Sequence, residues 1–441
     1  MQKHLAKPTA ALALLLCSFA WLASASRAGQ APAVRSASNA LLGGMNIPGL
    51  GSHSLPAEAD RTIAVARQMH VKIVRADFPW STLEPQAAGT IDPRALAFAD
   101  RLVGDAAAAG IRVVATVAGT PCWASAAPPS LVARCRPGQD NAASSWPPRA
   151  PADYAAIVAF LARRYGSQLA AIEVWNEPDQ SNEFYFAGPH KAARYAAVLR
   201  AAYPAIKQAS PSLPVLAGSL VGSNGVFLKS LYVAGIMGYY DGLSVHFYNL
   251  TLASLRAIHE VQFSFGDTKP LWLDEFGWSS CWPRHRIQQE QACVTPRVQA
   301  ANLTSMFRAL ARTPYVAAAL AYKLQDSTLE DFGMLSTSGG HKPAFSAISH
   351  VMASSYAGVS PVLLNLRRAG ARILASGSAP VGDFMELEAF QGSVLRYTAT
   401  FILDRFNHFR IPLPKVLGTH GLRVRVYQYT TGPARDAEKT I

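Results

Sequence analysis

Two short runs of the chain place a glutamate at the end of an apolar stretch and beside aromatic residues. The first is Ile172–Asp179 (IEVWNEPD) and the second is Leu271–Trp278 (LWLDEFGW). Their glutamates, Glu177 and Glu275, lie far apart in the sequence, so separate strands would carry them. Two such carboxylates suit hydrolysis of a sugar–sugar bond, in which one protonates the leaving oxygen while the other attacks or activates water. Nearby Trp and Tyr rings would offer flat faces to sugar rings.

The elements that must position these carboxylates alternate between strand and helix signals. We expect strands at 41–46, 71–75, 111–117, 171–175, 213–217, 242–247, 270–274 and 316–324. We expect helices at 57–70, 93–110, 152–165, 190–210, 296–312 and 344–354, with Pro204 as a kink or break in the fourth. Eight strand-then-helix units predict an α/β fold, a closed (β/α)8 TIM barrel.

Polar residues follow the predicted strands, at the point where each strand ends. In a (β/α)8 barrel the active site is built at the carboxyl ends of the strands. The residues at these ends are Asn46, Arg75, Asp77, Asn176, Glu177, His246, Tyr248, Glu275, Tyr322 and Lys323. We therefore expect them to meet at one mouth of the barrel.

The motif Trp175-Asn176-Glu177-Pro178, with Glu275 in a later Asp-Glu-Phe-Gly, resembles the clan of retaining β-glycosidases that have a (β/α)8 barrel. Within the clan the chain resembles family 39 glycoside hydrolases, and among these the biofilm exopolysaccharide glycosidases of the Psl type. The resemblance spans roughly residues 40–350 and implies a retaining glycoside hydrolase. It also implies that Glu177 is the acid/base and Glu275 the nucleophile of a double displacement.

The same resemblance implies roles for the neighbours of the two glutamates. Asn176 would bind the sugar 2-hydroxyl. Arg75 and Tyr248 would lie close to Glu275 and keep it ionised, while burial and the charge of Glu275 would raise the pKa of Glu177. Sugar platforms are expected from the rings of Trp80, Trp123, Trp175 and Trp278. Tyr322 stands where clan members often carry a Trp at the end of strand eight.

Each assignment has a structural alternative. Glu177 could cap a loop, Glu275 could be an ion-pair partner of Arg75, and any one Trp could belong to the core. His246 is either a ligand of the site or a buried, hydrogen-bonded histidine. Glu173 is expected in the barrel interior or paired with a cation, and Asp274 in a structural role. Lys323 is expected either at the surface or as a charge behind the residues that touch the substrate.

Four cysteines follow the first thirty residues and form two local pairs. Cys122 and Cys135 are one pair, and Cys281 and Cys293 the other. Local pairing would close two loops, although four cysteines allow three connectivities. The spacing of Cys and His matches no metal motif, so neither a metal nor a cofactor is expected.

The long segment 121–151 is expected to form one wall of a substrate cleft, and the segment 281–293 the other. Walls on both sides predict an endo-acting enzyme on a bacterial exopolysaccharide. Two alternatives stay open: an exo-glycosidase on β-xylosides or β-glucosides, and a non-catalytic barrel that binds polysaccharide.

The chain divides into three predicted parts. Residues 1–28 have the basic start and apolar stretch of a signal peptide, or of an N-terminal membrane anchor. Residues 38–357 form the catalytic barrel, and 358–441 a β-sandwich-like accessory module with alternating strands. The protein is therefore expected to be exported, to the periplasm or the medium, with an anchor in the inner membrane as the alternative.

Composition limits the partners. The 441 residues are 50% hydrophobic and 16% charged, with a net charge of +13. The cations are scattered, which argues against nucleic acid as a partner. We expect a monomer that acts on a polysaccharide or oligosaccharide, with association with the inner membrane or an exopolysaccharide synthesis machinery left open.

Overall fold

The computed structural model describes residues 40–51, 54–139, 141–222, 224–248, 252–283, 293–358, 362–381, 384–417, 420–428 and 437–441. The predicted leader, residues 1–28, lies outside this part of the chain. Among the described residues, no helix combines the length and hydrophobicity needed to cross a bilayer.

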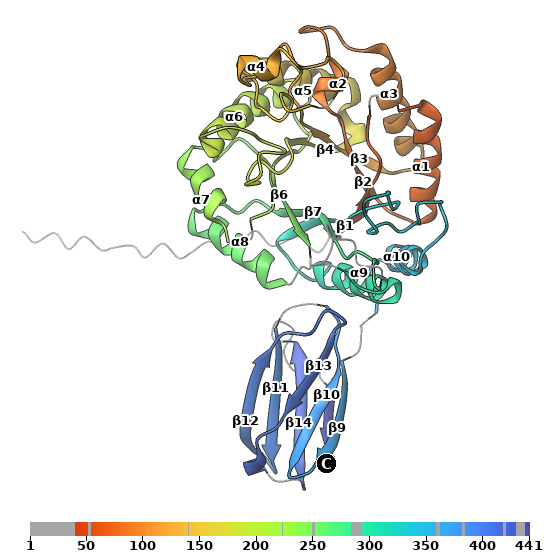
Figure 1. The fold of residues 1–441 in the computed structure, drawn as a ribbon, viewed down its shortest axis with the longest axis vertical. Coiled ribbons are helices and arrows are strands. Elements are labelled where there is room, and N and C mark those ends of the chain that lie inside the picture. The colour runs from red at the N-terminus through yellow and green to blue at the C-terminus, as the bar shows by residue number, and fades with distance from the viewer. Residues whose placement is uncertain are drawn as a thin grey trace, which may run out of the picture. The chain divides into compact units, whose positions relative to one another are not determined.

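Eight parallel strands close into a barrel in chain order (Figure 1). They are Leu42–Asn46 (β1), Ile73–Asp77 (β2), Arg112–Val117 (β3), Leu169–Val174 (β4), Val215–Leu220 (β5), Gly242–Tyr248 (β6), Leu271–Gly277 (β7) and Val316–Ala321 (β8). Pairing of β1 with β8 completes the ring. The predicted (β/α)8 barrel is confirmed.

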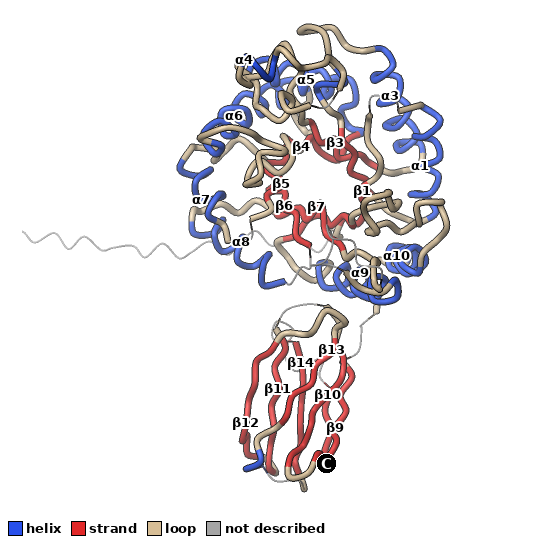
Figure 2. Tube along the Cα trace, viewed as in Figure 1, coloured by secondary structure: helices blue, strands red, loops and turns tan. Residues whose placement is uncertain are grey.

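Helices enclose the ring of strands (Figure 2). They are Pro56–Gln68 (α1), Trp80–Leu83 (α2), Pro93–Ala108 (α3), Pro129–Val132 (α4), Pro151–Tyr165 (α5), Lys191–Ala209 (α6), Val226–Val233 (α7), Leu252–Ser264 (α8), Pro296–Leu310 (α9) and Pro343–Ala353 (α10). Local sequence explains α3, because the Asp92 side chain accepts from the Arg94 and Ala95 amides and Pro93 stands in the first turn.

The structure departs from the expected helices in several places. It adds α7 and α8, after strands five and six, and the short helices α2 and α4. It also carries α6 through Pro204, so of the expected kink or break, the break does not occur. Val198, Leu199 and Ala202 bury one face of α6 around this point, and packing of that face outweighs the loss of one backbone hydrogen bond.

The last strands form two antiparallel sheets, as expected for a sandwich-like module. Their orders are β13-β10-β9 and β12-β11-β14-β15. The strands are Leu363–Ala369 (β9), Arg372–Ser378 (β10), Met385–Gln391 (β11), Val394–Phe401 (β12), His408–Pro412 (β13), Leu422–Gln428 (β14) and Ala437–Thr440 (β15). Alternate residues of β11 are buried in a separate hydrophobic core, which includes Met385, Leu387 and Ala389.

Two disulfides join the cysteines that lie close in sequence. Cys122 bonds to Cys135 and Cys281 bonds to Cys293. The expected local pairing is confirmed. Disulfides persist in oxidising compartments, which indicates an extracellular or periplasmic protein.

Candidate active site

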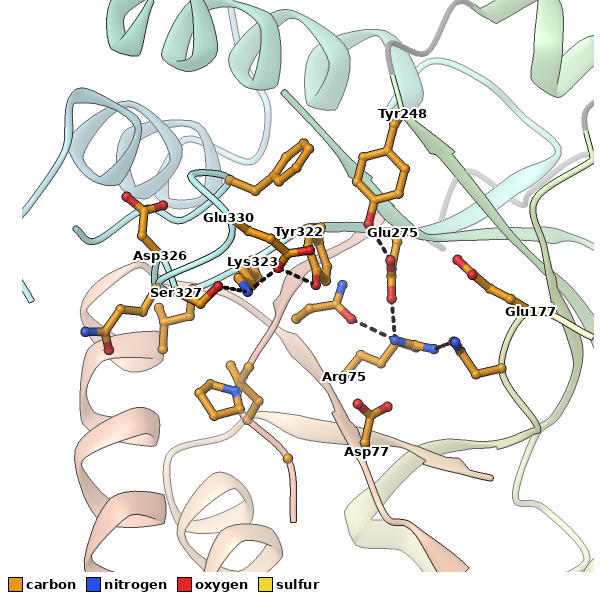
Figure 3. Close-up of a pocket in the computed structure, with 18 of the residues that line it drawn as sticks. Arg75, Asp77, Glu177, Tyr248, Glu275, Tyr322, Lys323, Asp326, Ser327 and Glu330 are labelled. Atoms are coloured by element: carbon orange, nitrogen blue, oxygen red, sulfur yellow. Dashed lines mark hydrogen bonds and ion pairs between the residues drawn. The ribbon is translucent and has the colours of Figure 1, made fainter. Parts of the chain in front are cut away.

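A cleft of about 1210 Å³ opens at the carboxyl ends of the barrel strands (Figure 3). Its lining contains most of the residues predicted from the strand ends. These are Asn46, Arg75, Asp77, Asn176, Glu177, Tyr248, Glu275, Tyr322 and Lys323. His246 is buried beside the cleft and contacts both predicted catalytic glutamates.

Arg75, in the middle of β2, contacts several residues of the site. Its Nη1 lies 2.8 Å from Glu275 Oε1, its Nε 2.8 Å from Glu173 Oε2, and its Nη2 2.7 Å from Asn176 Oδ1. The residue is only 3% exposed. Burial disfavours its charge, but Glu173 and Glu275 outweigh this and raise the pKa of Arg75.

Glu275 projects from β7 and accepts two strong hydrogen bonds. The Tyr248 hydroxyl donates to Oε2 at 2.5 Å, in addition to the bond from Arg75 to Oε1. Burial raises the pKa of Glu275, and the charge of Glu177 adds to this rise against the cations and the Tyr248 bond. The donors nevertheless point at the two oxygens that a nucleophilic carboxylate must keep oriented.

Glu177 follows β4 on a strained piece of backbone. Trp175 has φ of 74° and Glu177 φ of 45°, in the left-handed region that side chains other than glycine rarely adopt. Such positions cluster at active sites. The buried Trp175 ring secures this turn by packing on Phe186 and by donating from Nε1 to the Tyr185 carbonyl at 2.8 Å.

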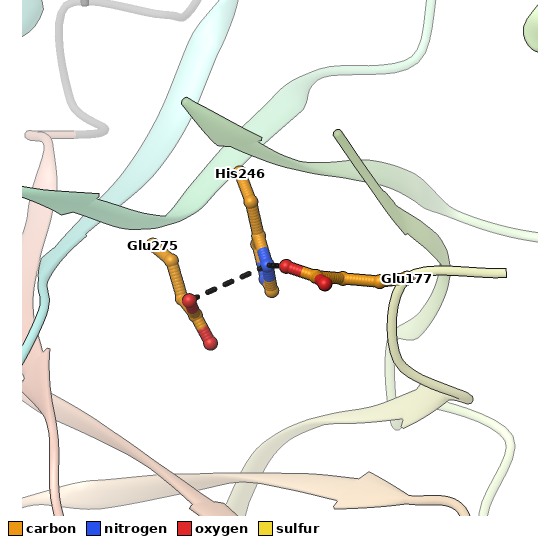
Figure 4. Close-up of side chains that lie close together, drawn as sticks. All are labelled: Glu177, His246 and Glu275. Carbon is orange, nitrogen blue, oxygen red and sulfur yellow. Dashed lines mark hydrogen bonds and ion pairs between the residues drawn. The ribbon is translucent and has the colours of Figure 1, made fainter. Parts of the chain in front are cut away.

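His246, on β6, lies between the two glutamates (Figure 4). Its Nδ1 is 2.8 Å from Glu177 Oε1 and 3.4 Å from Glu275 Oε2, while its Nε2 faces Asp274 Oδ1 at 3.5 Å. Burial disfavours the imidazolium, but Glu275, Asp274 and Glu177 together raise the pKa of His246 to about 9. His246 is therefore a buried, hydrogen-bonded histidine whose partners are the two predicted catalytic glutamates.

The expected pKa shifts of the glutamates need correction. Burial acts to raise the pKa of Glu177, but bonds from His246 and from Gln180, whose Nε2 donates at 2.7 Å, lower it overall. Glu275, expected to be held ionised, has its pKa raised. The reason is burial, to which the charge of Glu177 adds; His246 and Arg75 act to lower the pKa of Glu275 and do not outweigh burial.

Two more carboxylates lie below the catalytic pair. Glu173 accepts from Arg75 and from Thr116 Oγ1 at 2.7 Å, and Arg75 lowers its pKa against the effect of burial. The expectation that Glu173 pairs with a cation inside the barrel is confirmed. Asp274 is fully buried and accepts from Ser244 Oγ at 2.9 Å. Burial and the neighbouring Glu173 raise its pKa.

The loops after β8 and β4 form walls of the cleft. Tyr322 donates to Glu330 Oε2 at 3.1 Å, and Lys323 Nζ lies 2.5 Å from the same oxygen. The Tyr322 ring meets the Tyr248 ring edge-on at 5.7 Å. Tyr185, from the β4 loop, also lines the cleft.

Four predicted sugar platforms do not reach the cleft. Trp80 and Trp175 are fully buried and Trp278 is 4% exposed, so these rings offer no face to a sugar. Trp123 is half-buried and donates from Nε1 to the Glu84 carbonyl at 2.9 Å. None of the described residues of the segment 121–151 lines this cleft, so the structure does not show the expected wall there. Much of the segment 281–293 lies outside the described residues.

Sequence reasoning missed several functional candidates. Gln180 and Tyr185 lie in the loop after Glu177, and Glu330 lies in the loop after β8. Glu330 carries no strand or motif signal. Gln180 could have been suspected from its spacing of three residues after Glu177.

Glu177, His246 and Glu275 each offer one ligand atom, and these atoms lie within 4.8 Å of one another. These three side chains could bind a cation, but the Arg75 guanidinium and a protonated His246 would repel it.

A family model described as beta-galactosidase, glycoside hydrolase family 42, matches residues 53–211, a stretch that includes Glu177. No curated protein sequence matches the chain. Among solved structures, a GH39 beta-xylosidase from Caulobacter crescentus superposes with a TM-score of 0.51 at 18% identity, over 82% of this chain and 84% of the other.

Two further structures give the same result. A monomeric beta-xylosidase from Caulobacter crescentus CB15 has a TM-score of 0.54 at 15% identity, and a GH30 endoxylanase from Clostridium papyrosolvens C71 has 0.53 at 14%. Each covers 87% of this chain and 95% of the other. The chain shares the (β/α)8 barrel fold of these structures. The predicted resemblance to barrel glycosidases, and with it the prediction of a glycoside hydrolase, is confirmed at this level, whereas a likeness to the Psl type is not shown.

Proposed function

We propose that this glycoside hydrolase cleaves a β-linked sugar with retention of configuration, using Glu177 as acid/base and Glu275 as nucleophile. One observation carries the proposal. Two carboxylates meet at the mouth of the barrel with oxygens within 4.8 Å, and one of them is held by Arg75 and Tyr248.

The proposed reaction has two displacements. A Glu275 oxygen attacks the anomeric carbon, the bond to the leaving oxygen breaks, and Glu177 gives that oxygen its proton. Water then attacks the glycosyl-enzyme ester, Glu177 takes a proton from the water, and Glu275 is released as a carboxylate. Two inversions at one carbon restore the original configuration.

Asn176 is suited to the sugar 2-hydroxyl. Its Oδ1 accepts from Arg75, which fixes the orientation of the amide, and the residue lines the cleft next to Glu177. Hydrogen bonds to the 2-hydroxyl strengthen in an oxocarbenium-like transition state.

The finer assignment is an endo-acting enzyme on a bacterial exopolysaccharide. A cleft of about 1210 Å³ is larger than the roughly 300–1,000 Å³ typical of small-molecule sites, which supports a substrate of several sugars. The alternative, an exo-glycosidase on β-xylosides or β-glucosides, is supported by the two beta-xylosidases that share the fold. The released products distinguish the two candidates. An endo-acting enzyme would release oligosaccharides from the interior of the polymer, whereas an exo-glycosidase would release single sugars from its ends.

The proposal extends to location and organisation. Residues 1–28 would export the chain to the periplasm or the medium, or anchor it in the inner membrane near an exopolysaccharide synthesis machinery. The catalytic barrel, 38–357, would carry 358–441 as an accessory module. The protein would act as a monomer on the exopolysaccharide of a biofilm.

The test is hydrolysis of a panel of bacterial exopolysaccharides, plant β-glycans and aryl β-glycosides. Glu177→Gln and Glu275→Gln should each lower kcat by at least about 10²-fold, the scale of a lost acid/base group. Glu84→Gln is the matched control, because Glu84 is buried but lies outside the cleft lining. NMR of the first product should give the β-anomer. Inverted product would overturn the roles, and hydrolysis that is unaffected by both catalytic substitutions would refute the assignment of the two glutamates. Binding of a polysaccharide with no hydrolysis of any substrate would leave the non-catalytic barrel.

A further inference from the structure

The environment of His246 raises a question about where the acid/base proton resides. In the proposed mechanism Glu177 must carry a proton when substrate arrives. In the structure, however, Glu177 accepts from two donors, His246 and Gln180, and its pKa is lowered. A carboxylate in this setting is not by itself a reservoir for the proton.

His246 is placed to hold that proton. The ring is 1% exposed, and Nδ1 lies 2.8 Å from Glu177 Oε1, closer than the 3.4 Å to Glu275 Oε2. The ring therefore favours Glu177, on the side of the cleft where the leaving oxygen must bind. Contact with both glutamates is at Nδ1, which leaves Nε2 to the barrel interior.

Asp274 lies on the other side of the imidazole, next to Nε2. His246 Nε2 and Asp274 Oδ1 are both buried, and neither makes a hydrogen bond to another group among the described residues. They face each other at 3.5 Å. Ser244 and Arg75 hold the second oxygen of Asp274, at 2.9 and 3.3 Å, which aims Oδ1 at the imidazole.

We propose that His246, oriented by Asp274, stores the proton that Glu177 delivers to the leaving group. This inference rests on the proposed glycosidase function and deepens it. His246 and Asp274 are positioning residues, because they act through Glu177 and do not touch the reacting atoms.

The proton balance closes over one turnover. Before cleavage the imidazolium carries protons on both nitrogens and Glu177 is a carboxylate. The Nδ1 proton passes to Glu177, and from there to the leaving oxygen as its bond to carbon breaks. His246 is then neutral, with Nε2–H held toward Asp274. When water attacks the glycosyl-enzyme, its proton returns through Glu177 to Nδ1.

Charged groups approach this pair from four strands. Arg75 comes from β2 and Glu173 from β4, with Glu177 just beyond β4. Tyr248 lies on β6 with His246, and Glu275 lies on β7 with Asp274. The carboxylates outweigh Arg75, which agrees with a His246 pKa of about 9.

The first experiment uses His246→Gln in the full chain. A glutamine amide can still donate a hydrogen bond to Glu177, but it cannot release a proton. We expect kcat for a phenyl or alkyl β-glycoside to fall about 10²-fold, the scale of general acid catalysis, and kcat for a dinitrophenyl glycoside, which needs no acid, to change by less than about threefold. The alkaline limb of kcat/KM should also move down by about 2 pH units, because Glu177 then titrates without the imidazole.

Matched variants separate this role from loss of structure. His259→Gln alters a histidine that stacks on Tyr315 outside the cleft, and it should leave both readouts unchanged. Asp274→Ala should reproduce the lowered alkaline limb. An unchanged limb in His246→Gln, or equal losses for both leaving groups, would overturn the proposal.

A second measurement does not depend on activity. Imidazole ¹⁵N shifts of the wild-type protein, with His246 assigned from the missing signal in His246→Gln, should report a doubly protonated ring at neutral pH. A ring that is neutral at pH 7 would overturn the proposal, even if hydrolysis is found. Conversely, a protonated ring in a protein that cleaves no glycoside would refute the proposed function and not the protonation of His246.

Discussion

Removal of the Tyr248 hydroxyl tests whether Glu275 is the group that must be ionised. This hydroxyl donates to Glu275 Oε2 at 2.5 Å, while Arg75 donates to the other oxygen. Tyr248→Phe keeps the ring and its edge contact with Tyr322 but takes one donor from the carboxylate. The substitution therefore changes the charge balance of Glu275 with little change in packing.

The magnitude follows from the type of bond. A hydrogen bond to a charged group contributes about 1.5–3 kcal/mol, and one pKa unit corresponds to about 1.4 kcal/mol. The bond stabilises the ionised form of Glu275, so its loss should raise the pKa of this group by about 1–2 units. Since the ionised form attacks the sugar, the acid limb of kcat/KM should move to higher pH by the same amount, with partial recovery above it.

The assay is the initial rate of aryl β-glycoside hydrolysis as a function of pH. Tyr232→Phe is the matched control, because Tyr232 also donates to a buried carboxylate, Asp267 Oδ2 at 2.7 Å, but outside the cleft. It should lower stability and leave the pH profile unchanged. An acid limb in Tyr248→Phe that stays in place, or moves to lower pH, would refute the assignment of Glu275 as nucleophile.

Three further predictions follow from the same geometry. Because the pKa of His246 is raised from 6.5 to about 9, its contribution to stability is present below the lower value and is lost as the pH rises through the upper one. Denaturant titrations between these two pH values should show that the free energy of unfolding of the wild type falls by about 3 kcal/mol more than that of His246→Gln. An equal fall in both proteins would contradict the prediction. Replacing Cys122 and Cys135 by serine should cost about 2–4 kcal/mol in unfolding free energy, with kcat/KM unchanged because this loop does not line the cleft. A drop in kcat/KM of more than a few-fold would restore the loop as a wall. The cleft should also disfavour uronic acids, because its Lys323 already pairs with Glu330; kcat/KM for an aryl β-glucoside should exceed that of the matched glucuronide by about tenfold or more, and Glu330→Gln should narrow the gap.

The fold was predictable because each strand of the barrel is a short apolar run with polar residues at one end. Asp92 and Pro93 also marked the start of α3 in the sequence. By contrast, α7 follows Gly225 with φ of 68° and has only eight residues, so its periodicity was too short to stand out. Tertiary packing, which local sequence does not contain, holds such an element.

The site was predictable in membership and not in electrostatics. Strand ends placed Arg75, Tyr248 and Glu275 at one mouth, and the structure brings them into contact. His246 Nδ1 lies 0.6 Å closer to Glu177 than to Glu275, and this difference decides which glutamate it hydrogen-bonds. No spacing in the sequence encodes a difference of that size. The tryptophans failed for a related reason, since the same ring can stack on a sugar or fill a core.

The basic charge of the chain and the acidity of its cleft have separate causes. The net charge of +13 comes from cations that are scattered along the sequence, and salt screens exposed charges over a Debye length of about 8–10 Å. In the cleft, Arg75 and Lys323 each contact a carboxylate, and further carboxylates come from Asp77, Glu177 and Asp326. A substrate in the cleft therefore meets carboxylates at short range, whatever the charge of the whole protein. The choice of sugar therefore depends on the few groups within contact distance of the glycosidic bond, and not on the net charge of the chain.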